Sequence, residues 1–337
     1  MANTFSTPSK IKIRQEWNLP ILKLISERTG KKLIYLGLPS PDVDDIYEWI
    51  DYIDNVIAFQ CRKYPKPSEP SQSKEALDLL ETKLNTLETQ GKISTFTIYD
   101  GYIEEVLLRG RDISNNIYSQ NEVITLYNLD YCNSLSVPIP YIDSDGNEKK
   151  GYKFDAIKKL MEFQNRIQVA SKKFILFLTI KCDYYEGEMG VLINEGCDAN
   201  LKPIHQQYDN IKDIFEKKAR LLRSYTIQNL KAFFISNGFI PEFLPTINYN
   251  GKPIPRSKND FILLHFSVLG TQMTTAAGIA PFYQKIDELI KQNFIYVRNG
   301  NVQDIKIPNI EEMDVQYTPE DYITGCDSFV KHWIQNE

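Results

Sequence analysis

The sequence predicts a three-layer, doubly wound α/β fold with a mostly parallel, seven-stranded sheet that ends in an antiparallel hairpin. Two apolar, strand-like runs, Phe239–Tyr249 and Phe261–Gly270, are separated by about a dozen residues, which is too few for a crossover helix, so they must pair as a hairpin. The chain before them alternates strand-like and helix-like segments, which is typical of a parallel sheet covered by helices. The closing hairpin therefore adds antiparallel strands to a parallel array.

Each element of this alternation has its own signal in the sequence. Apolar runs bounded by turn residues predict the five parallel strands, at Leu33–Leu38, Asn55–Cys61, Ser94–Tyr99, Glu122–Leu129 and Phe174–Cys182. The last of these runs is continuously apolar, as in a strand covered on both faces. Apolar residues at helical spacing, with capping or stop residues, predict helices at Trp17–Arg28, Val43–Tyr52, Ser73–Thr89, Phe154–Ser171 and Asp209–Asn237.

The 337 residues suffice for one large domain with additions at its ends. We expect a helical lead-in over residues 1–30, the α/β domain over 31–272 and an acidic appendage over 273–337. Residues 64–71 are proline-rich and predict a surface excursion after the second strand.

The bulk composition excludes several classes of protein. Hydrophobic residues make up 42% and charged residues 25%, and the formal net charge of −5 argues against a chain coated with basic residues. The five cysteines are odd in number and contain no CxxC pair, so neither a disulfide framework nor a zinc knuckle is predicted. With no signal peptide and no apolar run long enough to span a membrane, we expect a cytoplasmic protein.

Ligands of doubly wound sheets bind beyond the carboxyl ends of the parallel strands, so the turns after the strands are the candidate site. The first predicted strand runs into Gly37-Leu38-Pro39-Ser40-Pro41, the second ends at Gln60, and Asp100 follows the third. The fourth ends in Asn128-Leu129-Asp130-Tyr131. Together with the closing hairpin, this arrangement resembles the class I S-adenosylmethionine-dependent methyltransferases.

The resemblance implies that Gly37, Pro39, Gln60 and Asp100 hold S-adenosylmethionine. Family members use a glycine-rich turn against the methionine part, an acidic residue on the ribose hydroxyls and an acid on the adenine amino group. Here two prolines replace permissive glycines, and Gln60 replaces the carboxylate. The cofactor motifs are therefore degenerate.

Asn128, Asp130 and Tyr131 are the candidate catalytic residues. Their stretch is loosely similar to the Asn/Asp-Pro-Pro-Tyr motif of amino-group methyltransferases, in which a polar group holds the target nitrogen and the aromatic ring stacks on a flipped base. Leu129 stands where the motif has prolines. A turn in which Asp130 merely caps the following segment is the competing interpretation.

Clustered basic residues suggest a nucleic-acid partner, because phosphate contacts require lysine and arginine. Residues 149–173 hold eight basic residues and residues 212–231 hold six, on two helices that we expect to lie side by side. The predicted contacts are Lys217 and Arg220 on the second helix and Lys252, Arg256 and Lys258 in the hairpin loop. Solvated helix faces are the competing interpretation, and a protein partner is also possible.

Three functions follow from these observations. The leading hypothesis is a methyltransferase that transfers a methyl group from S-adenosylmethionine to a nucleic-acid substrate. The alternative is a catalytically degenerate binding or scaffold subunit of a larger nucleic-acid-associated assembly. A third hypothesis is a nuclease that holds a divalent metal at Asp100, Glu104 and Glu105, although no metal site is predicted from histidine or cysteine spacing.

Overall fold

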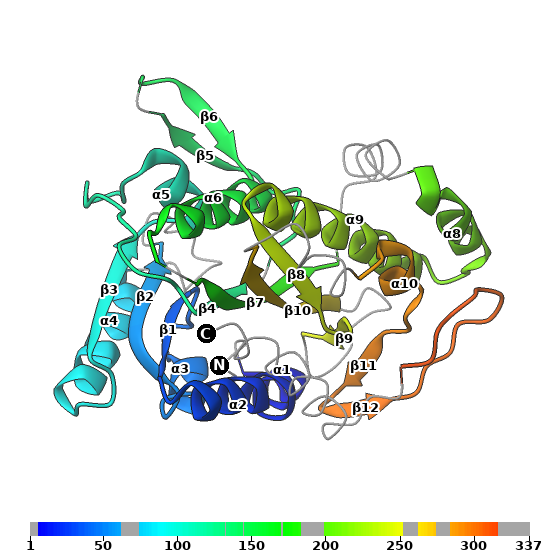
Figure 1. Ribbon diagram of the computed structural model, residues 1–337, viewed down its shortest axis with the longest axis horizontal. Coiled ribbons are helices and arrows are strands. Elements are labelled where there is room, and N and C mark those ends of the chain that lie inside the picture. The colour runs from blue at the N-terminus through cyan, green and yellow to red at the C-terminus, as the bar shows by residue number, and fades with distance from the viewer. Residues whose placement is uncertain are drawn as a thin grey trace.

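A computed structural model describes residues 6–61, 74–131, 133–143, 145–169, 171–182, 199–251, 262–273 and 284–315. It confirms the predicted fold class: a mixed α/β protein with a mostly parallel central sheet and an antiparallel hairpin (Figure 1). The strands of the main sheet are β1 (Leu33–Gly37), β2 (Ile53–Gln60), β3 (Thr95–Asp100), β4 (Leu126–Asp130), β7 (Lys173–Lys181), β8 (Phe239–Phe243), β9 (Ile247–Asn250), β10 (Ile262–Gln272), β11 (Ile295–Arg298) and β12 (Asn301–Gln303).

The strand order is β12-β11-β9-β10-β7-β4-β1-β2-β3, with β8 also paired to β10. The five strands from β3 to β7 are parallel to one another, and β10 is antiparallel to β7, β8 and β9. The sheet has ten strands rather than the predicted seven. The difference arises because the first arm of the hairpin is split into β8 and β9, and because β11 and β12 continue the sheet beyond β9.

The split in the hairpin has a local cause. Residues 244–246 join β8 to β9, and Pro245 in their middle has no backbone N–H to donate to the ladder. The backbone N–H of Leu244 still donates to the carbonyl of Ser267, at 3.0 Å. Both halves of the first arm thus pair with β10, the second arm, as the sequence predicted.

Helices cover both faces of the sheet (Figure 1). The helical segments are α1 (Pro8–Ile13), the π-helical turn η1 (Arg14–Asn18), α2 (Leu19–Thr29), α3 (Asp44–Glu48), α4 (Lys74–Thr89), α5 (Ile103–Arg109), α6 (Lys153–Arg166), η3 (Ala199–Leu201), α8 (Lys202–Gln207), η4 (Tyr208–Asn210), α9 (Ile214–Ser236) and α10 (Ile286–Lys291). A separate two-stranded hairpin, β5 (Ile139–Ile142) and β6 (Glu148–Gly151), projects from the α5 and α6 side.

Strand β7 divides two apolar cores. Phe174, Leu176 and Leu178 face the core that contains α5, α6 and α9, whereas Ile175 and Phe177 face the core that contains α2, α3 and α4. All five side chains are fully buried. This alternation explains why the strand reads as one continuous apolar run, and it confirms that the strand is covered on both faces.

No helix among the described residues is long and apolar enough to cross a membrane.

Candidate ligand-binding cleft

A cleft of about 180 Å³ lies at the carboxyl ends of β1 to β4. We call it the strand-end cleft. It is lined by the turn after β1, the end of β2, the start of α5, the end of β4 and the first residue of α6: Leu38, Pro39, Ser40, Pro41, Phe59, Gln60, Cys61, Gly101, Tyr102, Ile103, Glu104, Asp130, Tyr131, Asn133, Ile139 and Lys153. Four turns that are distant in sequence therefore meet at the place where doubly wound sheets bind ligands.

Gly37 ends β1 behind this cleft. A Cβ atom at this position would lie 2.5 Å from the backbone oxygen of Asn128 and 2.6 Å from the hydroxyl of Tyr35. Glycine is thus required for the close approach of β1 to β4. Pro39 and Pro41 follow it and line the cleft with apolar rings.

Asn128 is fixed by a buried carboxylate. The Asn128 side-chain amide donates to Asp45 Oδ2 at 2.6 Å and to the Tyr35 hydroxyl at 3.3 Å, and that hydroxyl also donates to Asp45 at 2.7 Å. Burial raises the pKa of Asp45, and its hydrogen bonds oppose the shift. Val43, which precedes α3, has a φ of 51°, a strained value for a β-branched residue in the turn that brings Asp45 here.

Asp130 forms an ion pair with the N-terminal helix. Lys10 Nζ on α1 lies 2.6 Å from Asp130 Oδ2, and the two side chains are 7% and 31% exposed. The second oxygen, Oδ1, is buried and has no hydrogen-bond partner in the part of the chain that the structure describes. Asp130 is thus held on one side only.

Asp130 also lines a second space of about 50 Å³, which we call the inner cavity. The two spaces share Asp130, Leu38 and Ser40. The remaining walls of the inner cavity come from α1, η1, α3 and the strands β4, β7, β9 and β10: Lys10, Ile13, Arg14, Asn18, Asp45, Trp49, Asn128, Thr179, Tyr249 and His265. Asp130 therefore lies at the junction of the cleft and the cavity.

Tyr131, Glu104 and Lys153 form a loosely paired polar group in the cleft. Lys153 Nζ lies 4.0 Å from Glu104 Oε1 and 5.4 Å from the centre of the Tyr131 ring. Burial raises the pKa of Glu104 and lowers that of Lys153, and each partner opposes the shift of the other. The buried Tyr131 hydroxyl finds no hydrogen-bond partner among the described side chains and backbone.

Gln60 and Asp100 occupy neighbouring strand ends, as the sequence predicted. They are paired in the register of β2 with β3, and both are largely buried. Gln60 lines the cleft, whereas Asp100 lies just behind Gly101 and is not part of its wall. The Asp112 carboxylate accepts from the Asp100 backbone N–H at 3.3 Å.

The acidic group proposed for a nuclease does not form a metal site. Within the described ranges, no three His, Cys, Asp or Glu side chains lie close enough together to hold a metal ion. Glu104 instead faces Lys153. This geometry gives no support to the nuclease hypothesis.

The structure thus brings Pro39, Gln60, Asp130 and Tyr131 into one cleft and places Gly37, Asp100 and Asn128 directly behind it. Two further charged residues, Glu104 and Lys153, line the cleft, and Lys10 lines the adjoining cavity. Sequence reasoning assigned no role at this site to Lys10 or Lys153. In the sequence, Lys153 directly precedes the predicted helix Phe154–Ser171 and is one of the eight basic residues of 149–173.

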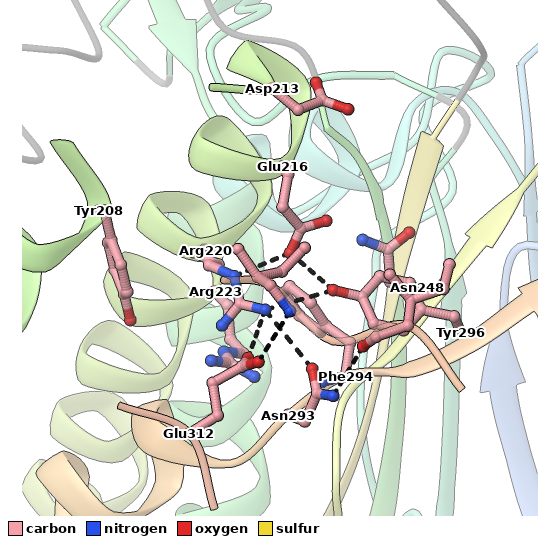
Figure 2. A network of polar contacts seen from close by, with 12 residues as sticks. Tyr208, Asp213, Glu216, Arg220, Arg223, Asn248, Asn293, Phe294, Tyr296 and Glu312 are labelled. Carbon is pink, nitrogen blue, oxygen red and sulfur yellow. Dashed lines mark hydrogen bonds and ion pairs between the residues drawn. The ribbon is translucent and has the colours of Figure 1, made fainter. Parts of the chain in front are cut away.

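The prediction that Arg220 contacts nucleic acid is wrong, because its side chain is only 1% exposed. Figure 2 shows it inside a polar network between α9 and the C-terminal part of the chain. Arg220 pairs with Glu216 at 2.7 Å and Glu312 at 2.5 Å, and it donates to the Tyr296 hydroxyl at 3.2 Å. The positive charge of Arg220 is therefore paired within the protein.

Two other basic residues of α9 are buried in the same way. Arg223 donates to the carbonyls of Ile290 and Gln292, at the C-terminal end of α10, and stacks on Phe294 at 4.2 Å. Lys231 donates to the backbone carbonyl of Gln284. We call the contacts of Arg220, Arg223 and Lys231 with residues 284–312 the C-terminal clamp.

Lys217 is partly exposed, and its ammonium lies 2.6 Å from Asp209. The predicted contact of α6 with α9 is confirmed by the rings of Phe154 and Tyr225, whose centres are 5.6 Å apart. Lys153, Lys172 and Arg223 are buried, so these three do not contribute to an exposed basic face. Lys252, Arg256 and Lys258 lie outside the described residues.

A protein-family model matches residues 5–230, about two thirds of the sequence, and its description is PP_RS20740-like. The chain belongs to the PP_RS20740-like family. The matched range contains the whole strand-end cleft and ends within α9. The sequence of this PP_RS20740-like protein matches none of the curated proteins.

Solved structures with similar folds include three bacterial proteins. The YcgJ protein of Bacillus subtilis is 11% identical with a TM-score of 0.36, and the match covers 76% of this chain and 99% of that chain. The O-methyltransferase TomG of Streptomyces achromogenes is 6% identical with a TM-score of 0.36, over 76% and 79% of the two chains. An O-methyltransferase of Bacillus cereus is 10% identical with a TM-score of 0.34, over 74% and 80%. At these scores, the fold of the PP_RS20740-like protein is better defined by its own strand order and register.

Proposed function

We propose that the strand-end cleft binds S-adenosylmethionine and that the protein is a methyltransferase. The observation that carries this proposal is the convergence of four strand-end turns, with Pro39, Gln60, Asp130 and Tyr131, in one cleft. Each of these residues follows or ends a predicted parallel strand, where the resemblance to the methyltransferases implies the site. The family comparison supplies no activity, so the proposal depends on the site itself.

The polar groups of the cleft match the chemistry of the cofactor. Its methionine part carries a carboxylate, which suits the Lys153 ammonium. Gln60 offers an amide to ribose hydroxyls. The Tyr131 hydroxyl is a buried donor without a partner among the described residues, as expected of a group whose partner is a ligand.

The chemistry that the cofactor supplies is an electrophilic methyl group on a sulfonium. The protein's part is to orient the acceptor and exclude water, and the buried walls of the cleft suit that task. Asp130 has a free oxygen among the described contacts, so it can accept a proton or a hydrogen bond from an acceptor nitrogen.

Calorimetric titration with S-adenosylmethionine tests the proposal directly. Gln60→Ala should weaken binding by about tenfold, because it removes one hydrogen-bonding group of the cleft. Gln168→Ala is the matched control, since Gln168 is exposed and outside the cleft, and it should bind as the wild type does. Absence of both heat and thermal stabilisation would refute cofactor binding.

One observation favours the alternative, a degenerate scaffold subunit. The side-chain nitrogen of Asn128 donates to both Asp45 and Tyr35, so its amide group cannot reorient towards a target nitrogen without breaking a buried network. A scaffold that has lost the chemistry would tolerate Asp130→Asn with no change in partner binding. A loss of methyl transfer in that variant would exclude the scaffold hypothesis.

A nucleic-acid acceptor stays a prediction based on Lys252, Arg256 and Lys258. Fluorescence anisotropy with a labelled oligonucleotide at two salt concentrations tests it, because displaced counterions make such binding salt-dependent. Replacing the three residues by glutamine should reduce both the affinity and its salt slope. Unchanged binding would remove the hairpin loop from the proposed interface.

A further inference from the structure

Lys10 lies beside the carboxylate at the junction of the strand-end cleft and the inner cavity. Its ammonium is 2.6 Å from Asp130 Oδ2, and Asp130 lines both spaces. The Lys10 side chain is only 7% exposed. The primary amine of the protein's own N-terminal helix therefore sits against the residue best placed to orient a methyl acceptor.

Burial of this amine is not needed to fasten α1 to the rest of the protein. Ser9 on the same helix donates to Asn250 Oδ1 at 2.9 Å and accepts from the backbone N–H of Gly300 at 3.2 Å. Ile13 and Trp17 are buried in the apolar core below the sheet. Since an ammonium is costly to bury, an apolar side chain at position 10 would suit a purely structural role better.

We propose that Lys10 is a methyl acceptor within its own chain, and this inference rests on the proposed function. Lys10 Nζ must first lose a proton, which the Asp130 carboxylate accepts and passes to solvent. The Nζ lone pair then forms the new N–C bond while the bond between methyl and sulfur breaks. The electron pair of that bond stays on sulfur, so the products are N-methyllysine and S-adenosylhomocysteine.

The chain offers a matched control in the Lys217–Asp209 pair. Its N···O distance is also 2.6 Å, but it lies on the surface near the start of α9 and outside both spaces. The two lysines thus share an ion-pair geometry, but only Lys10 lines the inner cavity that adjoins the cleft at Asp130. Only Lys10 should be methylated.

The experiment uses the full-length protein incubated with S-adenosylmethionine that carries a deuterated methyl group. Mass spectrometry after cleavage at acidic residues should find the heavy methyl on Lys10 and none on Lys217. Lys10→Arg keeps the charge next to Asp130 and should abolish the label. Asp130→Asn should slow labelling by about 100-fold, because it removes the proton acceptor.

Calorimetry on the same samples separates the two proposals. The Lys10→Arg protein should bind the cofactor within about twofold of the wild type, because the substitution leaves the cleft walls intact. Binding without any label on Lys10 would overturn this inference and leave the proposed function standing. No binding would overturn both, and equal labelling of Lys10 and Lys217 would show unspecific chemistry and overturn the inference as well.

Discussion

Two groups of buried polar and charged side chains in the described structure are paired very differently. In the C-terminal clamp, Arg220 alone has two carboxylate partners and a tyrosine hydroxyl, at distances of 2.5 to 3.2 Å (Figure 2). In the strand-end cleft, Lys153 and Glu104 are 4.0 Å apart, and Tyr131 has no hydrogen-bond partner in the described structure. The charge of Arg220 is thus compensated within the protein, although Arg223 Nε has no hydrogen-bond partner among the described residues, whereas the polar groups of the cleft are only loosely paired.

This difference separates structural charges from candidate functional ones. A buried charge is tolerated when several short contacts replace its water shell, and removal of one member then leaves the others uncompensated. A buried group that lacks such contacts costs stability, and its retention points to a ligand. The sequence alone makes the arginines of α9 the stronger functional candidates, because clustered arginines in a helix resemble a phosphate-binding face. The structure reverses this ranking of the two groups.

The largest expected effect is the loss of the clamp. Arg220→Met should lower the free energy of unfolding by about 3–5 kcal/mol, because Glu216 and Glu312 would be left buried without their cation. Lys217→Met on the same helix should change it by less than about 1 kcal/mol, because its pair is exposed. Urea unfolding followed by circular dichroism measures both. Equal losses of unfolding free energy in the two variants would show that burial of an ion pair on α9 does not determine its contribution to stability.

We expect low pH to reduce the stability of the protein, because the buried His265 must take up a proton. Burial lowers the pKa of His265 to about 4, and its ring nitrogens lie 3.0 Å from Asn18 and Thr179. The neutral form thus stabilises the fold fully above pH 6.5, and up to about 3 kcal/mol is lost as the pH falls from 6.5 towards 4.

His265→Gln should flatten this acid dependence of the unfolding free energy. His205→Gln is the comparison: burial also lowers the pKa of His205, but that residue on α8 is less buried than His265, so its replacement should flatten the profile less. An unaltered pH profile in the His265 variant would show that the acid loss has another source.

Removal of Lys153 should affect ligand binding more than stability. Lys153→Met leaves Glu104 buried, but burial already raises the pKa of that carboxyl, so it can take up a proton. At pH 6 we expect a loss of about 1 kcal/mol, which grows as the pH rises because the neutral acid becomes harder to maintain. Affinity for S-adenosylmethionine should fall by about tenfold. A stability loss as large as that of Arg220→Met would make this pair structural.

The smallest stability effect is expected at Tyr131. Tyr131→Phe removes a hydroxyl that has no partner among the described residues, so the unfolding free energy should change by less than about 0.5 kcal/mol. Cofactor affinity measured by calorimetry should nevertheless fall several-fold. Tyr127→Phe is the contrasting variant, because its hydroxyl donates to Gln164 at 3.0 Å in the core. It should lose stability and leave affinity unchanged.

The fold was largely predictable, because its signals are local. The continuous apolar run of β7 and the short separation of the hairpin arms each depend on adjacent residues, and both predictions are confirmed. The short helix α5 and strands β11 and β12 were not predicted, since short elements are stabilised mainly by packing against the rest of the chain.

The sequence by itself determined the five parallel strands, the long helices between them and the turns at the carboxyl edge, because hydrophobic periodicity is a local signal. Only the tertiary structure decided which charges are buried and what they pair with. Lys10 meets Asp130, and Arg220 meets Glu312, across long stretches of chain. Electrostatic pairing depends on distance in space, and no local pattern of residues encodes that distance.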